Sequence, residues 1–249
     1  MARRGLRLVI RRVVAKEERG KNMNNIELTI LMPCLNEEAT LENCIKEATK
    51  FIEENGVVAE ILIADNGSSD KSVNIAKANG AFVINVEEKG YGNALIAGIK
   101  AARGRYIIMG DCDMSYDFYH LGGFLQKLRE GNDLVMGNRF AGGIEKGAMP
   151  FSHRYIGVPF LSFLGRIKYR TKVKDFHCGL RGFNRRQALK LDLKCGGMEF
   201  ATEIIGAFAR NKRRIAQIPT VLRKDQREHP PHLNTIRDGF RHLIYIIKS

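Results

Sequence analysis

The sequence has no long apolar run. None of its 249 residues lie in a stretch that approaches the roughly 18–20 apolar residues of a membrane-spanning helix. Its five cysteines are odd in number and include no C-x-x-C pair, which argues against a disulfide framework and a zinc knuckle. The first 22 residues are unlike a secretory signal, because Arg11 and Arg12 interrupt their apolar part. These absences favour a chain that works in a reduced, cytosolic setting.

Acidic residues are scarce in the second half of the chain. Residues 1–22 carry a formal charge of +6, residues 23–136 carry −7, and residues 137–249 carry +15, for a net charge of +14. An acidic part joined to a strongly basic part predicts a cation site beside an anionic partner. Nucleic acid, a phosphorylated substrate and an anionic membrane surface all fit that description.

Apolar segments bounded by turn residues alternate with helical patterns in the first half. We expect strands at 26–32, 57–64, 81–86 and 106–109, with helices at 40–54, before Gly80 and at 94–102. This order predicts an α/β fold with a parallel sheet, whose ligands bind at the carboxyl ends of the strands. Gly90-x-Gly92 is no dinucleotide fingerprint, because Leu95 stands where the third glycine belongs.

The strand at 106–109 runs through Gly110 into Asp111 and Asp113. Strand alternation would place both carboxylates on one face, where they repel each other unless a cation binds. Hard oxygen ligands of this kind suit Mg²⁺ or Mn²⁺. The alternative is a solvated acidic turn or a helix N-cap.

Several short motifs in a fixed order resemble those of the family-2 glycosyltransferases with the GT-A fold. They are Pro33-x-x-Asn36-Glu37, Asp65-Asn66-Gly67-Ser68-x-Asp70, Lys89-Gly90-x-Gly92-Asn93-Ala94, Gly110-Asp111-x-Asp113 and Gly137-Asn138-Arg139-Phe140. Later motifs around His153-Arg154, Asp175-Phe176-His177, Met198-Glu199-Phe200 and Arg237-Asp238-Gly239 resemble the branch that transfers sugars to polyprenyl phosphate. The resemblance covers about residues 26–248.

The resemblance implies a mostly parallel central sheet flanked by helices and followed by a C-terminal amphipathic helix. We expect a basic extension at 1–22, a catalytic domain at 23–232 and a membrane-proximal helix at 233–249. Within the catalytic domain, residues 23–136 would form the nucleotide and metal half, and residues 137–232 the acceptor half.

The resemblance also implies roles for individual residues. The nucleotide-sugar site would contain Pro33, Leu35, Asn36, Glu37, Ala64, Asp65, Asn66, Lys89, Asn93, Asp111, Cys112, Asp113 and Arg139. The catalytic group would be Asp111, Asp113, Arg139, Asp175 and Glu199, and the Mg²⁺ or Mn²⁺ ligands Asp111, Asp113 and Ser115. The acceptor phosphate would meet Arg154, Arg223, Lys224, Arg227 and His229.

Some positions depart from the family pattern or have a second interpretation. Ser115 stands where mannose synthases often have Gln, Asn66 where many relatives have Asp, and His229 where Arg is expected. Asp175 and Glu199 could instead be buried partners of arginines such as Arg181.

The predicted function is inverting, metal-dependent transfer of a hexose from a nucleoside diphosphate sugar to polyprenyl phosphate. UDP-glucose is the first choice of donor and GDP-mannose the second. The alternative is transfer to a saccharide or other hydroxyl acceptor, which would need a carboxylate base such as Glu199 or Asp175. Nucleic acid is not an expected partner, because no module with aromatic and basic residues interleaved is present.

The segment 235–248 reads as a basic amphipathic helix. Its apolar face would carry Ile236, Phe240, Leu243, Ile244 and Ile247, suited to the plane of an anionic membrane surface. The alternative is a helix packed on the core. We expect a cytoplasmic protein attached peripherally to the inner face of the membrane, with a membrane-embedded subunit or a second copy as a further candidate partner.

Overall fold

A computed structural model of the chain describes residues 26–228 and 235–249. In these residues one sheet of seven strands has the order β3-β2-β1-β4-β6-β5-β7. Its strands are β1 (Leu28–Cys34), β2 (Ala59–Asp65), β3 (Phe82–Asn85), β4 (Tyr106–Met109), β5 (Leu134–Asn138), β6 (Arg181–Asn184) and β7 (Ile215–Pro219). Only β6 runs antiparallel to its neighbours, which confirms the mostly parallel α/β sheet.

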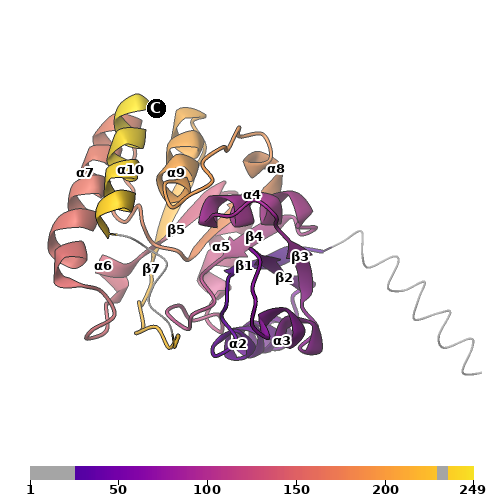
Figure 1. Cartoon of the computed structure of the whole chain (residues 1–249). Helices are drawn as coiled ribbons and strands as arrows, with labels where there is room; N and C mark the ends of the chain where they lie inside the picture. The colour runs from indigo at the N-terminus through magenta and orange to yellow at the C-terminus, as the bar shows by residue number, and fades with distance from the viewer. Residues whose placement is uncertain (1–25, 229–234) are drawn as a thin grey trace, which may run out of the picture.

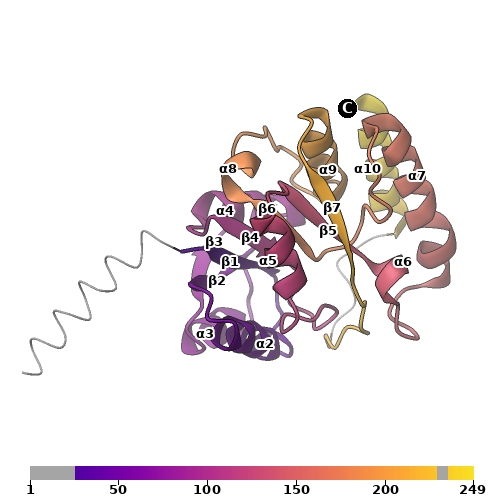
Figure 2. The ribbon, with the colours of Figure 1, turned by 180° about the vertical axis from the view of Figure 1, so that it is seen from behind.

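Helices cover both faces of this sheet (Figures 1 and 2). They are α2 (Leu41–Glu54), α3 (Ser72–Ala78), α4 (Tyr91–Ala101), α5 (Gly122–Arg129), α6 (Arg139–Gly142), the π-helical turn η1 (His153–Gly157), α7 (Val158–Tyr169), α8 (Arg185–Ala188), α9 (Phe200–Arg210) and α10 (Thr235–Lys248). The predicted strand 106–109 and helix 235–248 match β4 and α10. The other predicted bounds differ by up to three residues, and helix ends are the least determined by local sequence.

Strand alternation divides the core into two apolar layers. Ile30 and Met32 of β1 pack on the side that includes α2 and α5, whereas Leu31 packs on the side that includes α4 and α9. Because both faces are covered, the central strands are nearly continuous apolar runs. The expected division at residue 136 falls inside β5, so the two halves of the catalytic domain share one sheet.

Helix α10 packs beside α7 and α9 (Figures 1 and 2). Asp238, His242 and Ile246 are buried, and Leu243 is partly buried, while Phe240, Ile244 and Ile247 remain exposed. The expectation of a single membrane-facing stripe therefore needs correction at Leu243, which faces the core. The packed-helix alternative describes one side of α10, and the other side is still apolar and exposed. The side chain of Ile236 lies outside the described residues.

The packing of α10 predicts a pH dependence of stability. Burial, more than the nearby Arg181 and Arg241, lowers the pKa of His242 from 6.5 to about 4. His177, edge-on to His242 with ring centroids 4.5 Å apart, also has its pKa lowered well below 6.5 by burial. Between pH 6.5 and 4 the unfolded state therefore binds more protons than the folded state, so stability falls as the pH falls.

For His242 alone this shift is worth about 3 kcal/mol by pH 4. Urea unfolding measured from pH 7 to pH 4.5 should show the loss, and the His242→Gln variant should reduce its slope. The control is His120→Gln, because the His120 side chain is exposed. An unchanged slope in His242→Gln would contradict the expectation.

Within the described residues, no helix combines the length and the apolar character that crossing a bilayer requires.

Candidate functional site

Three loops meet where β1, β2 and β4 end. Parallel pairing aligns the carboxyl ends of these strands, with Cys34 opposite Asp65 and Leu31 opposite Met109. The loops that follow contain most of the predicted nucleotide and metal residues. The topology therefore brings together side chains that are about 30–80 residues apart in the chain, as expected for the carboxyl edge of a parallel sheet.

The loops after β1 and β2 are fastened to each other by hydrogen bonds. The Ser69 amide donates to Asn36 Oδ1 at 2.8 Å, and the Glu37 amide donates to Ser72 Oγ at 2.9 Å. Asn36 adopts a left-handed backbone conformation with φ of 58°, which Asn tolerates better than most residues. Asn36 thus shapes this edge through its backbone as well as its amide.

Asp65 and Asn66, the predicted base-reading pair, both contact backbone groups. The Asp65 carboxylate accepts hydrogen bonds from the Gly67 and Ser68 amides at 3.1 and 3.2 Å. The Asn66 side chain donates to the carbonyls of Val86 and Glu88 and accepts from the Gly90 amide. A carboxylate could not make the two donations, so the Asn that replaces the family's usual Asp fastens the loop after β3.

Lys89 and Asn93 lie at the start of α4, next to this loop. Lys89 Nζ donates to the Asn66 carbonyl at 2.6 Å, and Asn93 Nδ2 donates to the Lys89 carbonyl at 3.1 Å. A Cβ at Gly92 would clash with the carbonyl of Cys195. The glycine therefore permits close approach of the segment before α9, rather than cradling a phosphate.

Asp111 lies just beyond β4 and accepts a hydrogen bond from Tyr91 Oη at 3.0 Å. Burial raises the pKa of the Asp111 carboxyl, an effect opposed by this hydrogen bond and by the positive charges of Arg227, Arg181 and Arg139. Burial also raises the pKa of Tyr91 well above 10, so the phenol is a neutral donor. Sequence reasoning passed over Tyr91, although it sits between the two glycines of a quoted motif.

Asp113 forms an ion pair with Arg227. Arg227 also approaches Glu37, with 3.8 Å between Arg227 Nη1 and Glu37 Oε1. β4 ends at Met109, and the backbone of Met114 has a left-handed conformation. Strand alternation therefore does not orient Asp111 and Asp113. The two carboxylates instead belong to what we call the acidic loop, residues 110–117. Arg227, predicted to meet the acceptor phosphate, places its positive charge on this loop.

A segment of residues 223–228, here called the basic loop, lies across the acidic loop. The Gln226 amide donates to the Asp113 carbonyl at 3.0 Å, and the Arg223 amide donates to the Ser115 carbonyl at 2.9 Å. Ser115 is buried, and its amide donates to Asp113 Oδ1 at 2.9 Å. The described residues include no group of three or more His, Cys, Asp or Glu side chains that could hold a metal ion.

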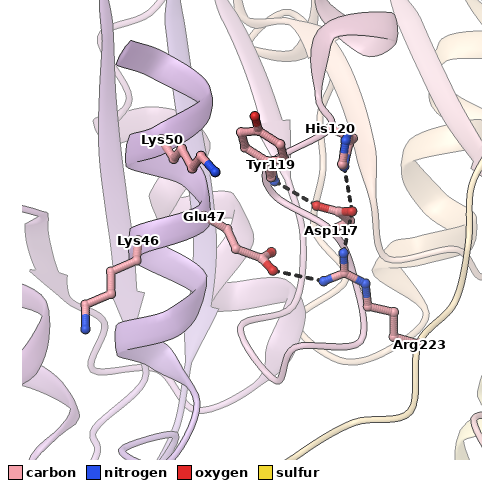
Figure 3. Close-up of a pocket in the computed structure, with 7 residues that line it drawn as sticks. All are labelled: Lys46, Glu47, Lys50, Asp117, Tyr119, His120 and Arg223. Carbon is pink, nitrogen blue, oxygen red and sulfur yellow. Dashed lines mark hydrogen bonds and ion pairs between the residues drawn. The ribbon is translucent and has the colours of Figure 1, made fainter. Parts of the chain in front are cut away.

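Arg223 anchors the basic loop to α2. Its guanidinium forms ion pairs with Glu47, at 2.9 Å, and with Asp117. Figure 3 shows these contacts at the edge of a pocket of about 300 Å³ whose lining also includes Lys46, Lys50 and Tyr119. Arg223 therefore holds the loop in position. Lys224 is exposed, and His229 lies outside the described residues.

Arg139 and Asp175 form a buried bidentate ion pair. Arg139 Nε and Nη2 lie 2.7 and 2.8 Å from the two Asp175 oxygens, and Asp175 is fully buried. Asp175 is thus an arginine partner, but of Arg139 and not of Arg181. Arg181 is buried too, and its guanidinium donates to the carbonyls of Cys178 and Ala201. The role of Arg139 as a diphosphate ligand stays a prediction.

Glu199 and Arg154 lie on the side of α9, α7 and α10. Glu199 Oε1 accepts from Arg241 of α10 at 2.6 Å, so the carboxylate that the sequence offered as a base is also ion-paired. Arg154 lies in η1 with its guanidinium 5.4 Å from the ring centroid of Tyr155.

The remaining predicted residues are part of the strand ends and the acidic loop. Cys112 Sγ donates to the Pro33 carbonyl, Ala64 is buried in β2, and Leu35 follows β1.

Comparison with solved structures shows which proteins share this fold. Glucosyl-3-phosphoglycerate synthase from Mycobacterium tuberculosis, in complex with Mn²⁺, UDP and glucosyl-3-phosphoglycerate, superposes with a TM-score of 0.70 and 23% identity, covering 91% of this chain and 80% of that one. The same synthase with phosphoglyceric acid gives 0.72 and 22%, covering 91% and 81%. The expected GT-A glycosyltransferase fold is thereby confirmed.

Sequence relatives carry the comparison further. A low-salt glycan biosynthesis hexosyltransferase of Haloferax volcanii is 36% identical over 221 residues, which cover 88% of this chain and 53% of that protein. A dolichyl-phosphate hexose transferase of the same organism is 30% identical over 159 residues, or 64% and 67% of the two chains. The chain thus spans about half the length of the first relative. The model of glycosyl transferase family 2 matches residues 29–191, and the chain therefore belongs to that family.

Proposed function

We propose that this family-2 glycosyltransferase moves a hexose from a nucleoside diphosphate sugar to polyprenyl phosphate with inversion and with a divalent metal. The observation that carries the proposal is the acidic loop, closed over by a basic loop, at the carboxyl edge of β1, β2 and β4. A nucleotide diphosphate there would meet cations from the basic loop and carboxylates from the acidic loop. The relative whose description names dolichyl phosphate supports the choice of acceptor.

Oxygen donors fit Mg²⁺ or Mn²⁺ at this site. Asp111 and Asp113 would supply carboxylates, the hard oxygen ligands that these ions prefer. A metal bound there would neutralise charge on the leaving diphosphate. The buried Arg181 and Arg139 already counter the charge of Asp111, and Arg227 counters that of Asp113. The Asp113 carboxylate is thus preorganised to face a cation.

The reaction needs positioning more than proton transfer. An oxygen of the acceptor phosphate would attack the anomeric carbon while the bond from that carbon to the diphosphate oxygen breaks, and the leaving diphosphate keeps the electron pair. The phosphate is already ionised at neutral pH, so no strong base is required. Cations of the basic loop, such as Lys224 and Arg227, would hold both phosphate groups in place.

The ion pairs of the site favour a phosphate acceptor over a hydroxyl acceptor. Transfer to a hydroxyl calls for a carboxylate base. Both predicted candidates are engaged, Asp175 by Arg139 and Glu199 by Arg241. A hydroxyl acceptor would therefore have to approach a carboxylate that a guanidinium already contacts.

Donor and acceptor can be tested separately. Thermal-shift measurements across UDP- and GDP-sugars with Mn²⁺ should show stabilisation by the true donor, with about 2.7 kcal/mol expected at 100 times its dissociation constant. UDP-glucose is the first choice and GDP-mannose the second. Transfer assays should then give product with polyprenyl phosphate and none with saccharides. Product formed only on saccharides would overturn the proposed acceptor.

We also infer peripheral attachment to an anionic membrane surface on the cytoplasmic side. What we call the apolar face consists of the exposed apolar side chains of η1, α7 and α10, together with Phe151 just before η1: Phe151, Tyr155, Ile156, Phe160, Phe163, Ile167, Phe240, Ile244 and Ile247. Basic residues border it, including Arg154, Arg166 and Lys168. Each such cation contributes about 1 kcal/mol near an anionic surface, attenuated over about 8–10 Å.

Flotation with liposomes tests this attachment. Binding should require anionic lipid, fall as salt rises to about 0.5 M, and weaken at least several-fold in Phe240→Asp/Ile244→Asp. The matched control, Val58→Asp/Leu189→Asp, adds the same charge at exposed apolar positions away from the apolar face. A wild-type protein that stays unbound beside anionic liposomes at low salt would show that the apolar face does not attach to membranes.

A further inference from the structure

A second basic site lies away from the acidic loop. It is a pocket of about 560 Å³ between the ends of α7 and α9 and the start of β7, here called the rear pocket. Six of its ten lining residues are cations and none is acidic: Lys168, Arg170, Lys172, Arg210, Lys212 and Arg213. Its volume falls within the range of small-molecule sites, which is about 300–1,000 Å³.

Strand directions place this pocket at the opposite edge of the sheet from the acidic loop. β4 and β5 are each antiparallel to β6, and β5 is parallel to β7, so β4 and β7 point the same way. Asp111 follows the carboxyl end of β4, whereas Ile215, which lines the rear pocket, begins β7. The rear pocket is therefore separate from the proposed nucleotide-sugar site.

Helix dipoles explain only part of this concentration of charge. Cations in the last turn of a helix are stabilising by about 0.3–1 kcal/mol, and the effect fades within that turn. Lys168 and Arg210 occupy such positions at the ends of α7 and α9. Lys172, Lys212 and Arg213 lie beyond both helices, where they add mutual repulsion without that compensation.

The rear pocket also contains an unused hydrogen-bond donor. Arg213 Nε is buried and has no hydrogen-bond partner among the described residues. Buried polar groups are usually satisfied, so such an atom calls for an explanation. An oxyanion would satisfy it, and guanidinium and ammonium groups together are the usual partners of phosphate oxygens.

We propose that the rear pocket binds a ligand with two or more phosphate charges. Two sources offer that chemistry: the headgroups of anionic lipids, or a soluble phosphate compound. The rear pocket adjoins the apolar face, because Lys168 Nζ donates to the carbonyl of Ile247 at 3.2 Å. A membrane that receives Ile167 and Ile247 would thus bring its headgroups near the pocket.

The first experiment uses inorganic tripolyphosphate and calorimetry on the full, metal-free chain. Lys172→Glu/Lys212→Glu should weaken binding at least tenfold. Both side chains are exposed and enter no ion pair within 4 Å in the described residues. The matched control, Arg186→Glu/Lys190→Glu, makes the same charge change on exposed residues at α8 and should weaken binding less than twofold.

Equal weakening by the two double variants, or weakening by neither, would show that tripolyphosphate does not bind in the rear pocket. If charge reversal disturbs folding, Lys172→Gln/Lys212→Gln removes the charges without adding repulsion and should still weaken binding at least threefold. None of these measurements depends on transfer activity, so they succeed or fail independently of the proposed function.

Flotation with vesicles of phosphatidylcholine containing phosphatidylglycerol distinguishes the two sources. Flotation that falls in Lys172→Glu/Lys212→Glu, but not in the α8 control, identifies lipid headgroups as the ligand. Unchanged flotation together with lost tripolyphosphate binding identifies a soluble phosphate compound. If neither probe depends on the rear pocket, the proposal is wrong.

Discussion

Replacing Asp113 with Ala is expected to lower the transfer rate at least about a thousandfold, because the variant loses a carboxylate that we propose binds the divalent metal. Asp113 is a buried residue of the acidic loop, and its carboxylate contacts Arg227 and the Ser115 amide and contributes no apolar surface to the core. The fold should therefore persist. Activity is measured with the donor found by thermal shift, and folding by circular dichroism and urea unfolding.

Two further measurements separate lost chemistry from a displaced basic loop. Calorimetry in the presence of UDP should show that the Asp113→Ala variant binds Mn²⁺ much more weakly than the wild-type protein. Arg227→Ala removes the other half of the ion pair but keeps both carboxylates, so it should retain Mn²⁺ binding. An active Asp113→Ala variant, or full activity in EDTA, would refute the metal-dependent mechanism.

The largest effect on stability is expected from Asp175→Ala. Asp175 is fully buried and holds Arg139 through two side-chain bonds of 2.7 and 2.8 Å. Its removal leaves a buried guanidinium without its counter-charge, which typically costs about 3–5 kcal/mol. Urea unfolding should show a lower midpoint with little change in slope, and the product of the midpoint shift and the slope should give that loss.

The control for Asp175→Ala is an ion pair that solvent already screens. Glu130 pairs with Lys127 at 2.7 Å, and both side chains are more than 40% exposed. Glu130→Ala should leave the urea midpoint nearly unchanged, because exposed ion pairs contribute little to stability. A double variant, Asp175→Leu/Arg139→Met, removes both charges and should recover much of the loss. Equal small effects from Asp175→Ala and Glu130→Ala would contradict the buried-pair interpretation.

Local sequence was sufficient for most of the fold. A short, continuous apolar run predicted β4 at its observed bounds, and the 3.6-residue pattern predicted α10 at its observed bounds. Turn residues after three strands predicted which loops would meet, because parallel strands place their carboxyl ends at one edge. These features depend on side chains that are close in the sequence.

The pairing of charged side chains depended on tertiary structure alone. From the sequence, Arg181 was the example of a buried partner for Asp175, but the structure pairs Asp175 with Arg139, and Asp113 with Arg227. The predicted roles of Arg139 and Arg227 as phosphate ligands stay predictions. Periodicity indicates which way a residue faces within one element, but not which distant carboxylate lies within hydrogen-bond reach. Asp113 and Arg227 lie in different loops, and only the packed sheet brings them together.

The two faces of α10 and the composition of the rear pocket also depend on tertiary structure. The sequence determined that residues 235–248 form an amphipathic helix. Only packing against α7 and α9 determined that Leu243 turns inward while Phe240 and Ile244 stay exposed. The +15 charge of residues 137–249 was visible in the composition. That six of its cations line one pocket depends on the ends of α7 and α9 lying close together in the fold.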